Sequence, residues 1–254
     1  HISYYAGRDG SLHYAHFTGT SWETETVDQP GDADVGYFSS LALDSGDKAS
    51  IAYYDWTNQT LKYATNTSGS WQTASIEGTG YGKYCSLGLD SNGYAHISYL
   101  DEKNGNLRYA TNRSGSWSRE TLDLSTPVAL STALVVDSAN KIHISYFDST
   151  NKDLRYVYGE SGTWHWQYID RTGDVGYHDS ITVDSNNEPH ISYYDATNGT
   201  LRYAFRSGIT WTITTLDPAA NVGQDNHIAM DSSNKIHIAY YDATNYLLKY
   251  AGER

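Results

Sequence analysis

The chain has 254 residues, a formal net charge of -13 and an aromatic share of 14%, with 24 tyrosines. The negative charge excludes nucleic acid as a general partner, because binding a phosphate backbone needs a basic surface. The lone cysteine, Cys85, excludes an internal disulfide framework, and no apolar run reaches the length of a membrane span. We expect one domain over residues 1–254.

Four short phrases recur along the chain, and each is rich in the residues that favour β-strands. In chain order, the first is a His-Ile-Ser-Tyr-Tyr-Asp phrase, the second is Leu-Arg-Tyr-Ala, the third is a Trp followed six residues later by an acid, and the fourth is Leu-Ala-Leu-Asp. The first phrase begins at positions 1, 50, 96, 143, 190 and 237, so its last three intervals are each 47 residues. Turn chemistry bounds the phrases, and nothing has helical period.

Four strands in a repeat of this length predict one blade of a β-propeller. Within a blade we place Leu-Ala-Leu-Asp innermost, then His-Ile-Ser-Tyr-Tyr-Asp, then Leu-Arg-Tyr-Ala, with the Trp strand outermost. The chain holds six copies of the second and third strands but five of the first and fourth. We therefore expect an all-β, six-bladed propeller of four-stranded antiparallel blades, with a seam between the first and last repeats.

A five-bladed ring is the alternative. There the Trp22 strand would complete the blade of residues 228–251 and leave residues 1–15 spare. The start at His1, in the middle of a repeat, suggests a trimmed mature form or a larger parent chain.

Gly-Ser-Trp turns at 69–71 and 115–117 fall between the third and fourth strands, and there the chain resembles Asp-box or sialidase-like propellers and propeller lectins. The Ser-x-Asp-x-Gly-x-x-Trp spacing of a true Asp-box is not met. The resemblance implies the propeller fold and allows a ring of weak carbohydrate sites, one per blade. In such sites Trp or Tyr faces would stack on sugars, and Arg108, Arg155 and Arg202 would bind hydroxyl groups.

Residues that recur at one position in the blades are interpreted as structural. We expect His96, His143, His190 and His237 to be hydrogen-bonded rather than metal ligands, because they lie on separate blades. The aspartates that end the same strands stand in an Asp-x-x-Asn context typical of Asx-turns. They are Asp55, Asp101, Asp148, Asp195 and Asp242.

Residues that differ between copies gather between each outer strand and the next inner strand, where we expect loops that surround one opening. The predicted ligand-binding residues are Tyr37, Lys83, Tyr84, Tyr177, His178, Asp225 and His227. If the protein is an enzyme, the catalytic or metal-binding residues would be His178, His227, Asp179 and Asp225. A water-filled polar channel mouth is the competing interpretation, and no motif specifies a reaction class.

Weaker signals complete the pattern. Asp32 and Asp34 could seat calcium, although the remaining oxygen ligands are not evident. Cys85, two residues from Lys83, is a candidate reactive thiol. Sequons for N-glycosylation lie at Asn58, Asn66, Asn112 and Asn198.

These features together favour a secreted or cell-surface propeller that binds a glycan without catalysis and without a cofactor. Two alternatives stand. One is an extracellular scaffold or filament-associated module that binds proteins or itself, and the other is a polysaccharide lyase or glycosidase.

Overall fold

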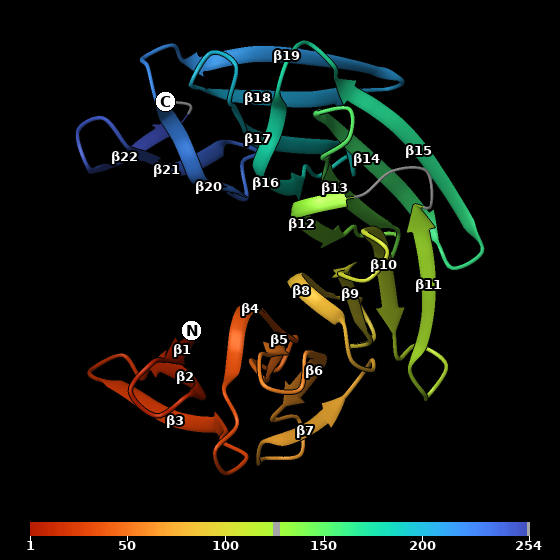
Figure 1. Ribbon diagram of the computed structural model, residues 1–254, viewed down its shortest axis with the longest axis vertical. Helices are drawn as coiled ribbons and strands as arrows, with labels where there is room; N and C mark the ends of the chain where they lie inside the picture. The colour runs from red at the N-terminus through yellow and green to blue at the C-terminus, as the bar shows by residue number, and fades with distance from the viewer. Residues whose placement is uncertain (124–127, 253–254) are drawn as a thin grey trace. The chain divides into compact units, whose positions relative to one another are not determined.

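The computed structural model describes residues 1–123 and 128–252, and the regular elements in these ranges are β-strands (Figure 1). The chain divides into two compact units, His1–Asp123 and Leu124–Arg254. A single domain over residues 1–254 therefore stays a prediction. Within the described ranges, no helix is long and apolar enough to cross a membrane.

The first unit holds three antiparallel sheets, which we call blades one to three. Their strands are β1 (Ile2–Ala6), β2 (Ser11–Phe17) and β3 (Trp22–Asp28); β4 (Val35–Leu43), β5 (Ala49–Asp55), β6 (Thr60–Thr65) and β7 (Gln72–Ser75); and β8 (Tyr81–Leu89), β9 (Ala95–Asp101), β10 (Asn106–Thr111) and β11 (Ser118–Asp123).

The second unit holds blades four to six. Their strands are β12 (Val128–Val136), β13 (Ile142–Asp148), β14 (Asp153–Glu160) and β15 (Thr163–Asp170); β16 (Val175–Val183), β17 (Pro189–Asp195), β18 (Thr200–Ser207) and β19 (Thr210–Asp217); and β20 (Val222–Met230), β21 (Ile236–Asp242) and β22 (Leu247–Gly252).

The strand order within each blade confirms the order predicted from the repeat. Each four-stranded blade runs antiparallel from the Leu-Ala-Leu-Asp strand to the Trp strand, as in β4-β5-β6-β7. In the described residues, blade one has no strand of the first type and blade six has none of the fourth, as the phrase count predicts. Inner strands of successive blades lie side by side within each unit, β4 with β8, and β12, β16 and β20 in turn.

Aspartate side chains close two turns in each of blades two to six. At the first turn, Asp90 Oδ1 accepts the backbone N–H groups of Asn92 (2.9 Å) and Tyr94 (3.0 Å). At the second turn, Asp101 Oδ1 accepts the backbone N–H of Asn104 (3.2 Å), and its Oδ2 accepts Asn104 Nδ2 (2.8 Å). This is the Asx-turn predicted for the Asp-x-x-Asn sequence. A carboxylate thus satisfies backbone donors that would otherwise stay unpaired.

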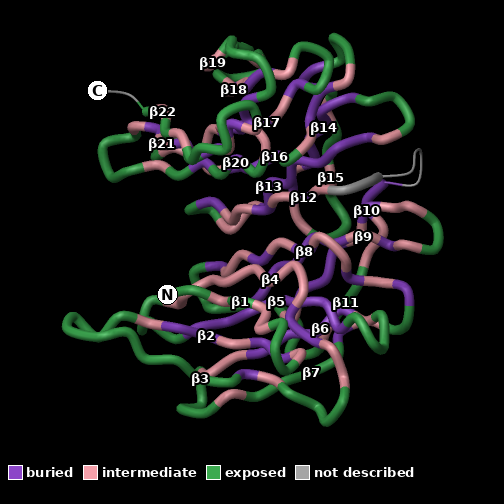
Figure 2. The backbone as a smooth tube through the Cα atoms, turned by 60° about the vertical axis from the view of Figure 1, so that its left-hand side comes forward, coloured by how far each residue is buried: buried purple, intermediate pink, exposed green. Residues whose placement is uncertain are grey.

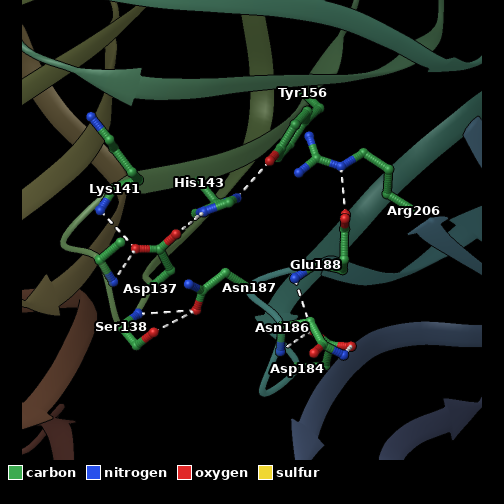
Figure 3. A network of polar contacts seen from close by, with 11 residues as sticks. Asp137, Ser138, Lys141, His143, Tyr156, Asp184, Asn186, Asn187, Glu188 and Arg206 are labelled. Atoms are coloured by element: carbon green, nitrogen blue, oxygen red, sulfur yellow. Dashed lines mark hydrogen bonds and ion pairs between the residues drawn. The ribbon is translucent and has the colours of Figure 1, made fainter. Parts of the chain in front are cut away.

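A histidine and a tyrosine join the second and third strands of a blade (Figure 3). The His143 Nδ1 atom lies 2.5 Å from the Tyr156 hydroxyl, and its Nε2 lies 3.1 Å from Asp137 Oδ2. Blade two replaces the histidine by Ser50, which lies 2.7 Å from the Tyr63 hydroxyl. The same His–Tyr distance of 2.5 Å recurs in His1–Tyr14, His96–Tyr109, His190–Tyr203 and His237–Tyr250. The structural interpretation of these histidines is confirmed.

In three blades, a tryptophan at or directly before the start of the outer strand packs on the preceding blade. The Trp71, Trp117 and Trp211 rings lie edge-on at 5.2 Å from the rings of Tyr14, Tyr63 and Tyr156. Each indole belongs to a core cluster between two blades. Figure 2 shows the consequence, because buried residues follow the middle strands while most of β3 and the hairpin turns are exposed.

Within each unit, an acid at or just beyond the end of an outer strand holds the next blade. Tyr193 donates its hydroxyl to Asp170 Oδ2 (2.7 Å), and the Arg202 guanidinium lies 2.6 Å from the same oxygen. Although burial alone would raise the pKa of Asp170, hydrogen bonds from Thr172, Tyr193 and Arg202 hold it below its usual value. The same acid–tyrosine–cation contact recurs as Asp28–Tyr53–Lys62, Glu77–Tyr99–Arg108 and Asp217–Tyr240–Lys249.

Replacing His143 by Gln tests the contacts of this histidine with Tyr156 and Asp137. Burial lowers the pKa of His143, and the nearby Asp137 opposes this only in part. The unfolded chain therefore binds more protons, so this contribution to stability is complete above the unfolded pKa of about 6.5 and is lost as the pH falls from there through the folded pKa. We expect His143→Gln to cost about 1–3 kcal/mol at pH 7.5 and to make the decline toward pH 5 shallower.

Urea unfolding at pH 7.5 and at pH 5 measures the free energy of unfolding of each variant. His165→Gln, at an exposed position in β15, is the control and should leave both values unchanged. If the free energy of unfolding changed with pH equally in His143→Gln and the parent protein, His143 would not be the buried group whose lowered pKa causes the decline.

Replacing Arg202 by Met tests the contact between blades. The change leaves the Asp170 carboxylate buried with one partner fewer, so we expect a loss of about 3 kcal/mol in the free energy of unfolding. Lys141→Met is the control, because the side chains of Lys141 and its partner Glu160 are 45% and 41% exposed, so their ion pair is a surface pair. If both variants unfold at the same urea concentration, the Asp170 contact does not hold the blades together.

Candidate functional site

The residues expected in loops before the inner strands lie in the strands themselves. Residues 36–40, 82–86, 176–180 and 223–227 form the first halves of β4, β8, β16 and β20, where the pairing register shifts. The loop prediction was wrong for a steric reason. Gly82 has φ +122°, and a Cβ there would lie 2.7 Å from the Leu61 α-carbon of the preceding blade. Glycine therefore lets the strand begin pressed against its neighbour, with a bulge instead of a loop.

In three of these strands, the residue after the glycine rests on a ring of the preceding blade. The Tyr37 ring lies 4.2 Å from that of Tyr5, and the Tyr177 ring lies 4.0 Å from that of Phe147. Lys83 takes the same place in blade three, with its ammonium 5.7 Å from the Tyr54 ring. Tyr37, Lys83 and Tyr177 differ between blades, but each is held in place by an aromatic ring at the same position of the preceding blade. We call this ring the aromatic base.

An exposed indole lies beside this base in the first unit. Trp56 is 48% exposed, its ring is 5.1 Å from that of Tyr37, and the Lys83 ammonium lies 4.9 Å from it. Lys83 also pairs with Glu102 at 2.7 Å. We call Tyr37, Trp56, Lys83 and Glu102 the Trp56 cluster. It combines an apolar ring face with donors and acceptors at its rim.

Two carboxylates, Glu102 and Asp34, interact with the polar groups at the edge of the Trp56 cluster. Burial, and after it Glu102, raises the pKa of Tyr54 beneath Lys83, so this phenol stays a neutral donor. Tyr37 donates its hydroxyl to Asp34 Oδ2 (3.2 Å). The Oε1 atom of Glu102 has no hydrogen-bond donor among the described residues. That oxygen is buried, so a ligand would reach only the other carboxylate oxygen, Oε2, which is paired with Lys83.

The third predicted residue of the first unit, Tyr84, lies beside this cluster. Its ring is 4.5 Å from that of Phe38, and both residues have positive φ, 54° and 52°. These are the bulge positions of β8 and β4, and a positive φ is unusual for aromatic residues.

The predicted residues of the second unit separate into exposed and buried groups. The His178 Nδ1 atom lies 3.0 Å from Asp225 Oδ1, and both side chains are exposed. His227 is also exposed, but no hydrogen bond or ion pair joins it to this pair within the described residues. The structure thus brings together His178 and Asp225, on adjacent blades, with Tyr177 next in the strand.

Asp179 does not join His178 and Asp225 at the surface. It is 7% exposed, and its Oδ2 accepts a hydrogen bond from the Ser145 hydroxyl of blade four. Burial raises its pKa. The predicted catalytic set of His178, His227, Asp179 and Asp225 is therefore not gathered in one place, because the bulge turns residue 178 outward and residue 179 into the contact between blades.

Cys85 occupies in blade three the position that Asp179 occupies in blade five. Its Sγ lies 3.1 Å from the Phe38 carbonyl oxygen, in the same core cluster as Ala52. Complete burial raises the pKa of the thiol to about 12, so thiolate does not form at neutral pH. The prediction of a reactive thiol was wrong, and Cys85 serves as a small packing residue.

The three arginines proposed as sugar ligands are held by carboxylates and aromatic rings. Arg108 pairs with Glu77 (3.0 Å), and Arg202 pairs with Asp170. The Arg155 guanidinium lies 3.6 Å from Asp148 and 4.7 Å over the Tyr168 ring. Their first role is to join strands and blades.

The remaining signals of the sequence concern Asp32 and the four sequon asparagines. Asp32 is exposed, and within the described residues no group of three His, Cys, Asp or Glu side chains could hold a metal ion. Asn58 and Asn198 donate their side-chain amides to Asp55 and Asp195, while Asn66 and Asn112 accept backbone N–H groups. These contacts explain why asparagine stands there, and glycosylation stays a prediction.

Trp56 and Glu102 were missed by sequence reasoning. Both occupy the turn position after the second strand, where the other blades carry Ser149, Ala196 and Ala243. A large side chain at one copy of a repeated turn is the signal that could have found them.

Comparison with known proteins gives the fold. No protein-family model and no curated protein matches the sequence. AofleA from Arthrobotrys oligospora matches at a TM-score of 0.66 and 18% identity, over 99% of this chain and 81% of that one. The Aleuria aurantia lectin AAL, an N224Q mutant in complex with Fucα1-6GlcNAc, matches at 0.64 and 13%, over 98% and 86%. The NanB sialidase from Streptococcus pneumoniae matches at 0.61 and 11%, over 95% and 63%.

These likenesses and the six antiparallel sheets show that the chain has the six-bladed β-propeller fold, similar to that of propeller lectins and sialidases.

Proposed function

We propose that this chain is an extracellular glycan-binding propeller and that the Trp56 cluster holds a sugar ring. The observation that carries the proposal is the exposed Trp56 ring, bordered by Lys83 and Glu102. An indole face takes the apolar side of a sugar, while an ammonium and a carboxylate at its rim bind the hydroxyl groups. The likeness to a lectin in complex with a disaccharide supports the same class of ligand.

The rigidity of this cluster favours binding. Trp56 follows Asp55, whose carboxylate accepts the Asn58 backbone N–H at 2.8 Å and closes the turn. Lys83 is held by Glu102 from the next turn. A site whose side chains are already positioned loses less entropy when a ligand binds.

The low identity to AofleA and AAL leaves the sugar itself to experiment. A cluster with both charges in an ion pair fits a neutral sugar, because an anionic one would compete with Glu102 for Lys83. Neutral fucosylated and galactosylated glycans are therefore the first probes, with sialylated glycans as the contrast.

Replacing Trp56 by Ala tests the site. Glycan arrays identify a bound neutral glycan, and calorimetry with that glycan then gives its affinity for each variant. We expect Trp56→Ala to weaken binding about tenfold or more, since stacking on an aromatic ring is lost. Trp166→Ala, which removes an indole that is 47% exposed in β15, is the matched control and should bind normally. Equal affinity of Trp56→Ala and the parent protein would reject the site.

A hydrolase is the second candidate, because the His178–Asp225 pair places an imidazole beside a carboxylate at the surface. The burial of Asp179 opposes it, since glycoside hydrolysis uses two carboxyl groups that flank the bond. We expect the double change His178→Ala and His227→Ala to leave glycan affinity within about twofold. Loss of glycan cleavage in this variant, measured by product chromatography, would instead favour the enzyme.

A further inference from the structure

A polar pocket lies between the first turns of blades two and three, inside the first unit. It has a volume of about 230 Å³ and is lined by residues 43–45 of blade two and 89–93 of blade three. We call it the Ser45 pocket. It lies at the ends of β4 and β8 that are opposite to Tyr37 and Lys83, so it is separate from the Trp56 cluster. A pocket of this size suits a small group, because sites for drug-sized molecules are about 300–1,000 Å³.

The second unit shows what occupies the same place between its blades (Figure 3). The turn of blade five carries Asn187, whose Oδ1 accepts the backbone N–H (3.2 Å) and the hydroxyl (2.9 Å) of Ser138 in blade four. In blade six, Asn234 Oδ1 accepts the backbone N–H of Ser185 (3.0 Å), and its Nδ2 donates to the Ser185 hydroxyl (2.8 Å). A side-chain carboxamide therefore binds the serine of the preceding blade's turn in both cases.

Blade three has a glycine where blades five and six have these asparagines. Gly93 is the third residue after the aspartate that closes the turn, as are Asn187 and Asn234. Its φ is 80°, and the φ angles of Asn187 and Asn234 are 64° and 61°, so the backbone turns in the same way. A Cβ on Gly93 would meet no atom within 4 Å. The Ser45 pocket is thus the space that an asparagine side chain fills elsewhere in the protein.

Ser45 presents the same two groups that bind a carboxamide in the other blades. Among the residues that the structure describes, its backbone N–H and its hydroxyl have no hydrogen-bond partner. Ser45 is also exposed, so a ligand can reach both groups. The carboxylates of Asp44 and Asp90 line the same pocket in a chain of net charge -13, and they disfavour an anion. A neutral group that both accepts and donates is therefore the best fit.

We propose that the Ser45 pocket binds a primary carboxamide, the group that asparagine and glutamine side chains carry. The ligand oxygen would accept the Ser45 N–H, and one ligand N–H would donate to the Ser45 hydroxyl, as Asn234 does with Ser185. A secondary amide in the trans form cannot make both contacts, because its oxygen and its N–H point to opposite sides. This inference does not rest on glycan binding at the Trp56 cluster.

Propionamide is the probe, and two-dimensional NMR of the isotope-labelled full chain follows the amide signal of Ser45. We expect a saturable shift with a dissociation constant on the order of millimolar, since a ligand with few heavy atoms gains little binding energy. Propionate and N-methylpropionamide should bind about tenfold more weakly, because each loses one of the two hydrogen bonds.

A second probe identifies the source of the carboxamide. N-acetyl-asparagine N-methylamide is an asparagine residue with blocked ends. If it binds at least as tightly as propionamide, the pocket accepts a side chain of another polypeptide, whereas binding of propionamide alone indicates a free small amide. Either result supports a carboxamide site.

Two substitutions exchange the glycine and the asparagine. Gly93→Asn supplies the side chain that fills the pocket, so it should abolish the Ser45 shift while the thermal unfolding midpoint is kept or raised. Asn187→Gly opens the equivalent place between blades four and five, so propionamide should then shift the Ser138 signal, which it leaves unchanged in the parent protein. Ser45→Ala keeps the backbone N–H and should weaken binding about threefold. Trp56→Ala is the control and should bind propionamide normally, so the glycan and carboxamide proposals can fail separately.

Three outcomes would overturn the proposal. One is a Ser45 signal that propionamide does not shift, whatever happens to Ser138 in Asn187→Gly, because the pocket would then hold only water. Another is a shift that Gly93→Asn retains, which would place the amide elsewhere. The third is equal binding of propionamide and propionate, which would show that no carboxamide is recognised.

Discussion

A buried tyrosine hydroxyl must have a hydrogen-bond partner, and most of this structure follows from meeting that need. Tyr53, Tyr99 and Tyr193 are fully buried, yet each donates its hydroxyl to an acid at the end of the preceding blade's outer strand. The acid in turn needs a cation, which Lys62, Arg108 or Arg202 supplies from the neighbouring strand. A tyrosine core thus joins blades by directed bonds as well as by burial.

This frame leaves the surface turns and bulges free to differ. Gly36, Gly82, Gly176 and Gly223 bring four inner strands against a leucine of the preceding blade, and in three of them the next residue lies on an aromatic ring of that blade. That residue is Tyr37, Lys83, Tyr177 or Gln224. The positions best suited for binding are therefore held rigidly, although their chemistry changes from blade to blade.

Sequence alone was sufficient for the fold because the repeat shows each strand several times. The Asp90 and Asp101 turns and the His143–Tyr156 contact follow from residues that recur at fixed spacing. The site was less predictable. Spacing does not reveal that the glycine before Tyr177 creates a bulge, so Asp179 was expected at a surface that it does not reach. Trp56 stands in a turn whose other copies are small, and its significance depends on Lys83, 27 residues away, meeting it in space.

Tryptophan has opposite roles in this protein, and strand register decides which one it takes. Trp71, Trp117 and Trp211 lie at or directly before the start of an outer strand, each beside a tyrosine of the preceding blade, and each fills the groove between two blades. Trp56 follows the end of β5 and reaches beyond the sheet, where its ring borders Tyr37 and Lys83 and faces solvent.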